Sequence, residues 1–462
     1  MRVLILTLLL ATGTGALALD VGFGEVDITP KLGGKKKVWL AGYGTGRQAA
    51  GVHDPLMARC VVLEEAGTRI ALVSVDLVGL QYPAVQEIRK LLPGFSYVLV
   101  SSTHNHEGPD VIGMWGRNHF SYGVNGDYVA EVVDKCAQLV KDTATRMTRE
   151  VTVSFGTAED RSLLKDSRQP AAFDAVMRVL VFWTKEGQKA GVLVQWNSHP
   201  EAMGAKNKLI TADFPWATVR ELKRVHACPV AYFTGAVGGL MAPPAGPTTF
   251  AYTERHGVEV AGLASRAVAA ARPIKLTPMK VEARMIYLPV TNKLYRLALS
   301  IGVLRRAGFA STGNPYRKGK EMNPRSSDQV ITVESEVACL KLGELLLASI
   351  PGELYPELVY GKFQDPADPA ADFPQADLEP TIMQIVGGRK WMLFGLANDE
   401  IGYLIPRRQW DTRKPYAYGR QRAQYGEANA CGPEAAAVVM NGFARCVNAL
   451  VRQGQPPRAA KP

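Results

Sequence analysis

Histidine is scarce in this sequence, and three of its seven histidines directly follow short apolar segments. His104 and His106 form an H-x-H motif just after residues 97–100. His199 follows residues 192–196 in the same way. On an extended chain, residues i and i+2 point to the same side, so both side chains of the motif can act on one ligand. Imidazole binds metal ions and transfers protons near neutral pH, which makes these three residues candidates for chemistry.

Two further metal-competent side chains occupy equivalent places. Glu353 follows the apolar residues 345–350, and Tyr403 lies shortly after residues 391–396. In open sheets, side chains at the carboxyl ends of strands converge on a ligand crevice. Two imidazoles and a carboxylate suit Zn²⁺, which would lower the pKa of a bound water molecule. The pattern therefore indicates a zinc site, although hydrogen-bonded structural histidines remain an alternative. The other histidines, at positions 53, 119, 226 and 256, are interpreted as structural or surface residues.

The elements that must position these residues alternate between strands and helices. Residues 70–75 and 97–100 read as strands around a helix over residues 83–92, which is a β-α-β unit. This mixture predicts an α/β (mixed α+β) fold: one large catalytic domain over residues 19–453, built on a mixed β-sheet with flanking helices, whose strand ends converge on the zinc site. Further helices are predicted at 127–141, 213–224, 258–270 and 433–451, and further strands at 151–155, 176–182, 192–196, 230–233, 281–290, 329–342, 345–350 and 391–396.

The composition is that of a globular protein with a sizeable core. Of the 462 residues, 47% are hydrophobic and 21% are charged, which excludes disorder or a coiled coil as the main theme. The net charge of +11 is spread over short basic runs rather than one block. We expect no nucleic-acid partner and no obligate protein partner, and at most peripheral attraction to an anionic membrane surface.

The first eighteen residues read as a cleavable signal peptide. A basic start is followed by the apolar residues 3–11 and by the small-x-small sequence Ala16-Leu17-Ala18. This predicts cleavage near Ala18 and a secreted or periplasmic protein, whereas the tail at 454–462 is expected to be disordered. The six cysteines could pair in an oxidising compartment, with Cys431 and Cys446 as the nearest candidates.

Seven segments, in the family's order, resemble the catalytic domain of the neutral/alkaline non-lysosomal ceramidases. They are residues 22–30, 51–59, 73–76, 101–109, 197–200, 350–353 and 395–403. The resemblance implies that the zinc ligands are His104, His199, Glu353 and Tyr403. It places His106 against the substrate and the zinc-bound water as general base or acid. It also implies that Arg161 holds the substrate's polar group or the oxyanion, and that Tyr425 is a second tyrosine of the site.

One segment departs from the family pattern. Residues 235–240 stand where the family carries Gly-Asp-Val-Ser-Pro-Asn, and they contain neither the aspartate nor the serine of that pattern. A serine nucleophile is therefore excluded here, whereas a mechanism based on zinc-activated water survives. Either the peptide N–H groups of Gly238 and Gly239 face the substrate as oxyanion donors, or the two glycines form a tight turn without a role.

These observations favour a secreted zinc-dependent amidohydrolase. Its expected substrate is a small molecule or lipid, either a ceramide-like N-acyl lipid or a related N-acyl compound. Two alternatives remain: a zinc hydrolase of a different ester or amide, and a catalytically silent, metal-stabilised protein that binds a glycan or lipid. The presence of all four ligand residues favours the enzyme.

Overall fold

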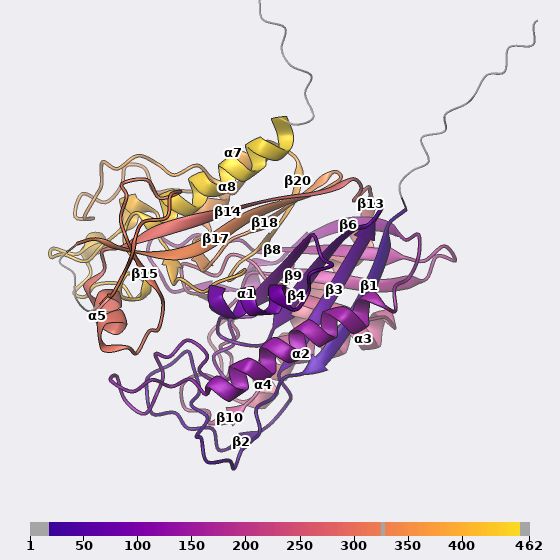
Figure 1. Ribbon diagram of the computed structural model, residues 1–462, viewed down its shortest axis with the longest axis horizontal. Coiled ribbons are helices and arrows are strands. Elements are labelled where there is room, and N and C mark those ends of the chain that lie inside the picture. The colour runs from indigo at the N-terminus through magenta and orange to yellow at the C-terminus, as the bar shows by residue number, and fades with distance from the viewer. Residues whose placement is uncertain (1–17, 325–328, 453–462) are drawn as a thin grey trace, which may run out of the picture.

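The structure is a computed structural model that describes residues 18–324 and 329–452 (Figure 1). Residues 1–17, with most of the predicted signal peptide, and the predicted tail at 454–462 lie outside the described residues. The α/β prediction is confirmed, but the strands form several sheets rather than one. Within the described ranges, no helix combines the length and apolar character needed to cross a membrane.

The first large sheet has the strand order β1-β3-β4-β5. The parallel strands β4 and β5 flank α1, which confirms the predicted β-α-β unit. Side chains of β3 alternate between two cores: Cys60 packs toward the helices, and Val61 packs toward the other sheets. The helix α2 covers the outer face, on β1 and β3. The bounds are β1 (Asp20–Asp27), β3 (Met57–Glu65), β4 (Thr68–Val75), β5 (Tyr97–Ser102), α1 (Tyr82–Lys90) and α2 (Gly126–Ala144).

The second large sheet has the order β11-β9-β8-β6-β13. Its outer face is covered by α3 and α4, which also pack on each other. Asp213 caps α3 by accepting a hydrogen bond from the backbone N–H of Phe214, and Pro215 lies in the first turn. The bounds are β6 (Thr152–Glu159), β8 (Val176–Trp183), β9 (Lys189–Trp196), β11 (Val230–Thr234), β13 (Arg272–Ile274), α3 (Phe214–His226) and α4 (Phe250–Ala270).

The third large sheet has the order β16-β15-β17-β18-β20, and β14 also pairs with β17. The helix α8 lies along β14 and β17 (Figure 1). The helix α5 was not predicted. The bounds are β14 (Met279–Val290), β15 (Gly308–Ala310), β16 (Glu321–Met322), β17 (Ile331–Leu342), β18 (Leu345–Ser349), β20 (Lys390–Phe394), α5 (Lys293–Ile301) and α8 (Ala435–Arg452). The shorter elements are β2 (Gly51–Val52), β7 (Lys165–Asp166), β10 (Leu209–Ile210), β12 (Met241–Ala242), β19 (Glu353–Leu354), β21 (Tyr403–Leu404), α6 (Glu357–Tyr360) and α7 (Ile382–Val386).

The three large sheets share one apolar core between their inner faces. Phe233 of β11 stacks on Phe394 of β20 with ring centroids 4.1 Å apart. Each sheet contains one parallel pair, and the carboxyl ends of these pairs are joined by hydrogen bonds. The N–H of Gly395 donates to the carbonyl of Thr234, and the hydroxyl of Ser101 donates to the carbonyl of Gly395. The strand ends therefore meet at one place.

The suggested pairing of Cys431 with Cys446 is wrong. All six cysteines are free and buried. Cys431 precedes α8, and its Sγ lies 3.4 Å from the carbonyl oxygen of Ile401. Cys446, within α8, instead has its Sγ 3.7 Å from the carbonyl oxygen of Val337. The two thiols are thus held against different segments, although they are close in sequence.

His256 gives a testable prediction about stability at acid pH. It is buried in α4, next to Phe214, and burial lowers its pKa to about 4. The unfolded chain has the ordinary histidine pKa of about 6.5, so it binds the proton first as pH falls, and folding stability drops below that pH. We expect His256→Leu to remove about 2 kcal/mol of the stability difference between pH 8 and pH 5. Denaturant unfolding at pH 8 and pH 5 measures this difference in stability. His119→Leu, at an exposed histidine, is the control. If folding stability depended on pH equally in both variants, His256 would not be the source of the acid sensitivity.

Candidate metal and catalytic site

His104 and His199 are oriented by backbone carbonyl groups. His104 follows β5 and His199 follows β9. The Nδ1 atom of His104 lies 2.6 Å from the carbonyl oxygen of Val78, and that of His199 lies 2.7 Å from the carbonyl oxygen of Met241. Since a carbonyl oxygen only accepts, each Nδ1 carries the hydrogen, and the neutral ring keeps a lone pair on Nε2. This is the arrangement in which histidine binds a metal.

Both lone pairs are aimed at Glu353. Its Oε2 atom lies 3.3 Å from Nε2 of His104 and 3.0 Å from Nε2 of His199, and all three side chains are buried. Two lone pairs that face a carboxylate oxygen away from water require a positive charge among them. Ligand atoms of a tetrahedral metal ion lie roughly 3.3 Å apart, which these distances match. The donor set therefore fits a metal ion.

Protons supply that positive charge when no metal is present. Burial by itself lowers the pKa of His199, but the hydrogen bond to Glu353, the charges of Glu201 and Glu353 and the contact with the carbonyl of Met241 together outweigh it and raise the pKa to about 9. The pKa of His104 is also raised, because the charge of Glu353, its hydrogen bond to His104 and the charge of Glu400 together outweigh burial. The two imidazoles in turn hold the pKa of Glu353 well below its usual range. Metal binding and protonation thus compete for the same three side chains.

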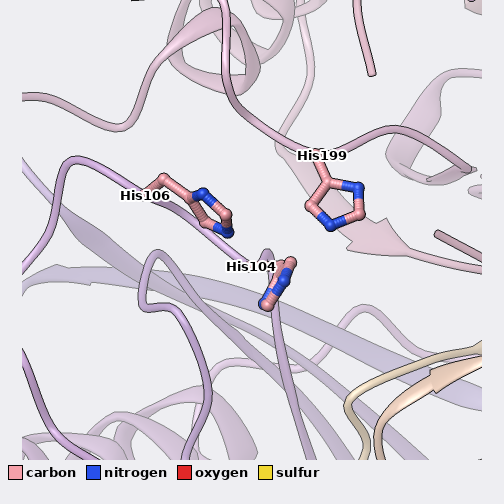
Figure 2. Close-up of side chains that lie close together, drawn as sticks. All are labelled: His104, His106 and His199. Atoms are coloured by element: carbon pink, nitrogen blue, oxygen red, sulfur yellow. The ribbon is translucent and has the colours of Figure 1, made fainter. Parts of the chain in front are cut away.

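His106 is the third histidine around this space (Figure 2). Its ring centroid lies 4.8 Å from that of His104 and 5.5 Å from that of His199. Nitrogen atoms of the three buried rings lie within 4.8 Å of one another, so this group could hold a metal ion. Nδ1 of His106 lies 2.9 Å from Oε1 of Glu201. Burial dominates and lowers the pKa of His106 to about 4 in spite of that carboxylate, so the ring is neutral at neutral pH and can accept a proton.

The two predicted tyrosines lie beside this cluster. The short strands β19 and β21 pair in parallel, and Tyr403 is the register partner of Glu353. Tyr403 is buried, and burial together with the charge of Glu353 raises its pKa well above the ordinary value. The ring of Tyr425 lies with its centroid 6.1 Å from that of Tyr403. The structure therefore brings both tyrosines to the same region as His104, His199 and Glu353.

Two cavities meet at these residues, with volumes of about 230 Å³ and about 530 Å³. The smaller, which we call the first cavity, reaches His104 and Glu353 and has mainly apolar walls, formed by Ile112, Met114, Trp115, Leu294, Ala298, Leu304 and Ile401. The larger, the second cavity, contains polar and charged residues, among them Tyr43, Thr45, His119, Lys165, Ser167 and Glu201. Their shared wall contains Gly42, His106, Met114, Trp115, Tyr403 and Tyr425.

The structure does not bring Arg161 to the cluster. Arg161 is exposed, and its guanidinium lies over the ring of Phe173, 3.6 Å from the ring centroid. It lines neither the first nor the second cavity. Its role in holding the substrate stays a prediction without a supporting contact.

The glycine segment forms a turn. The N–H of Gly238 donates to the carbonyl oxygen of Leu354, so it is not available to an oxyanion. A Cβ atom on Gly238 would lie 2.4 Å from the ring of Tyr355, and Gly239 has φ +77°, which explains why two glycines are needed. The expectation that the Gly238 N–H faces the substrate is therefore wrong, and the tight-turn interpretation is favoured.

Two carboxylates near the cluster were missed from the sequence. Glu201 lies two residues after His199, and its contact with His106 depends on the loop between them. Glu400 lines the first cavity, and its Oε2 has no hydrogen-bond partner among the described residues. Burial, followed by the charge of Glu353, raises the pKa of Glu400 to about 8. The sequence offers only one signal for them: Glu201 is close to His199, and Glu400 is close to Tyr403.

Gly42 gives a prediction about the position of His106. A Cβ atom at Gly42 would lie 2.2 Å from Cγ of His106, and Gly42 has φ +90°. We expect Gly42→Ala to displace the imidazole and to lower turnover roughly 100-fold, since misplacement by about 1 Å costs this much. The metal content should stay unchanged. Kinetics and metal analysis test this, with Gly44→Ala, which meets nothing within 4 Å, as the control. Equal activity of the two variants would show that His106 tolerates displacement.

Comparisons with known proteins identify a similar family and a similar fold. Residues 19–219 match the model of the neutral/alkaline non-lysosomal ceramidase N-terminal domain. The fold is similar to that of neutral ceramidase from Pseudomonas aeruginosa, with 19% identity, a TM-score of 0.70, and coverage of 96% of this chain and 76% of that one. It is also similar to a ceramidase complexed with C2, with 19% identity, a TM-score of 0.69, and coverage of 96% and 77%. No curated protein sequence matches the chain. The resemblance inferred from the sequence is thereby confirmed.

Proposed function

We propose that this chain is a member of the neutral/alkaline non-lysosomal ceramidase family, whose N-terminal model matches residues 19–219. In this proposal it is an exported zinc-dependent hydrolase that cleaves the amide bond of a ceramide-like N-acyl lipid or a related N-acyl compound. The observation that carries this proposal is the convergence of His104 and His199 on Glu353, whose Oε2 lies 3.3 Å and 3.0 Å from their Nε2 atoms. Residues 19–453 would form the catalytic domain. The signal-peptide pattern of residues 1–18 supports export.

The ion would be held by His104, His199, Glu353 and Tyr403. Nitrogen and oxygen donors of this kind are typical zinc ligands. The chemistry that zinc supplies when bound is polarisation of the amide carbonyl and acidification of a water molecule. The protein's own groups then handle the protons.

His106 is the proposed proton carrier. With Glu201 beside Nδ1, the hydrogen of the neutral ring is favoured on that nitrogen, and Nε2 is left to accept a proton from the attacking water. The same Nε2 would return the proton to the amine nitrogen as the amide bond breaks. Tyr425 lines both cavities and would contact the substrate carbonyl.

The residues that line the two cavities support an N-acyl substrate. The first cavity has mainly apolar walls and reaches His104, which suits an acyl chain. The second is larger and carries Lys165, Ser167 and Glu201, which suits the polar amine part of the substrate. The amide bond would then lie at the shared wall, beside His106 and Tyr425.

The test is an assay on substrates that share one acyl chain. We expect the zinc-loaded protein to release dodecanoic acid from N-dodecanoylsphingosine or N-dodecanoylethanolamine, as measured by mass spectrometry. A chelator should abolish release, and added zinc should restore it. Release from the matched dodecanoyl ester alone would favour an esterase. Stoichiometric zinc without turnover on any of the three would favour a binding protein.

A further inference from the structure

The helix α5 carries an apolar face that is exposed to solvent. It follows β14 and precedes β15 in the chain, and it lies below β15 at the left of Figure 1. Tyr295 and Leu299 are buried on one side. On the other side, Leu294, Leu297 and Ile301 are 58%, 50% and 39% exposed. Residues spaced by three and four positions lie on one face of a helix, so these side chains form a continuous apolar strip.

This strip is continuous with the first cavity. Leu294 belongs to both, since it is exposed on α5 and also lines the cavity. Ala298 and Leu304 extend the cavity wall from the same segment, and Tyr425, which is 53% exposed, lines the same cavity. An apolar molecule bound along α5 would therefore reach the space beside His106 without crossing water.

The surroundings of the strip are basic. Residues 293–320 contain seven lysines and arginines and no aspartate or glutamate. Some of these charges are neutralised from outside the segment: Arg306 is buried in an ion pair with Asp399, and Lys318 pairs with Glu334. The segment keeps a positive balance, with Lys293 at the first turn of α5 and Arg305 stacked on the ring of Tyr122.

We propose that α5 docks this protein on the surface of an anionic lipid bilayer, with Leu297 and Ile301 inserted among the lipids and the first cavity open toward them. An apolar strip bordered by basic residues is the pattern of helices that lie in a membrane interface. A second copy of this chain is a poorer occupant, because two segments with the same positive charge would face each other. Docking goes beyond hydrolysis and does not depend on it.

Vesicle co-sedimentation with the full-length chain tests the proposal. We expect binding to phosphatidylcholine vesicles that contain phosphatidylglycerol, and weakening by salt. The double substitution Leu297→Ser with Ile301→Ser should weaken binding roughly tenfold or more, because two partly exposed apolar side chains no longer insert. Val52→Ser with Leu378→Ser is the matched control, since these side chains are 46% and 45% exposed elsewhere. Equal binding of both double variants would overturn the proposal.

A second variant separates charge from apolar contact. Lys293→Ser should weaken binding to the anionic vesicles about fivefold and leave binding to pure phosphatidylcholine unchanged. Light scattering without vesicles tests the alternative that a second copy covers α5. If the protein were a dimer and the Leu297 and Ile301 substitutions dissociated it, the proposal would be overturned. Hydrolysis of a soluble short-chain amide should be unaffected by the Leu297 and Ile301 substitutions, so failure of docking and failure of the proposed activity are distinguishable.

Discussion

Replacing His199 with alanine is expected to remove the bound metal and hydrolysis together. Its Nε2 is one of the two nitrogens aimed at Oε2 of Glu353, and its Nδ1 is held by the carbonyl of Met241. Loss of an outer contact to a ligand lowers metal affinity roughly 10–100-fold, and loss of a ligand should cost more. Glu353 would also keep a buried charge with one partner fewer. We expect the same result for His104→Ala, with metal content measured by plasma mass spectrometry after dialysis.

The control is a buried histidine that lies away from the metal cluster. His256 is as buried as His199 but packs against Phe214 and Tyr252 in α4. The His256→Leu variant should therefore lose no metal at neutral pH. If His199→Ala retained stoichiometric metal and activity, the ligand assignment would be wrong. If both variants lost metal, unfolding rather than ligation would explain the result, and circular dichroism would reveal it.

The convergence of His104, His199 and Glu353 could be predicted because it depends on a general property of sheets. Each of these residues follows an apolar strand, and the three strands belong to parallel pairs whose carboxyl ends meet. The number of sheets could not be predicted in the same way. Strands buried on both faces, such as β18, appear only as apolar runs, which do not reveal their neighbours.

The positions of side chains in loops could not be predicted from the sequence. Glu201 and Glu400 lie in loops without periodic pattern, and their positions are set by distant contacts with His106 and Glu353. Arg161 matches a local family motif, yet its guanidinium is held over Phe173. The apolar spacing of α5 can be seen in the sequence, but such spacing ordinarily marks a face buried in the core.

The second large effect is expected for His106→Ala, which should lower turnover roughly 10²–10⁴-fold while the metal is retained. His106 differs from the other two histidines of the cluster in its partners. Nδ1 of His104 and of His199 faces a backbone carbonyl, whereas Nδ1 of His106 faces the carboxylate of Glu201. That carboxylate also stabilises the charged ring after proton transfer, as a proton carrier requires.

Metal analysis of His106→Ala decides between proton transfer and ligation, because nitrogen atoms of all three histidines lie within 4.8 Å of one another. Loss of metal equal to that of His104→Ala would make His106 a ligand. Retention of metal with unchanged turnover would exclude it from proton transfer. Glu201→Gln tests the contribution of the carboxylate. It removes the charge beside Nδ1 of His106 but keeps the shape of the side chain. We expect it to retain metal and to lower turnover less than His106→Ala does, since the imidazole that moves the proton is still present.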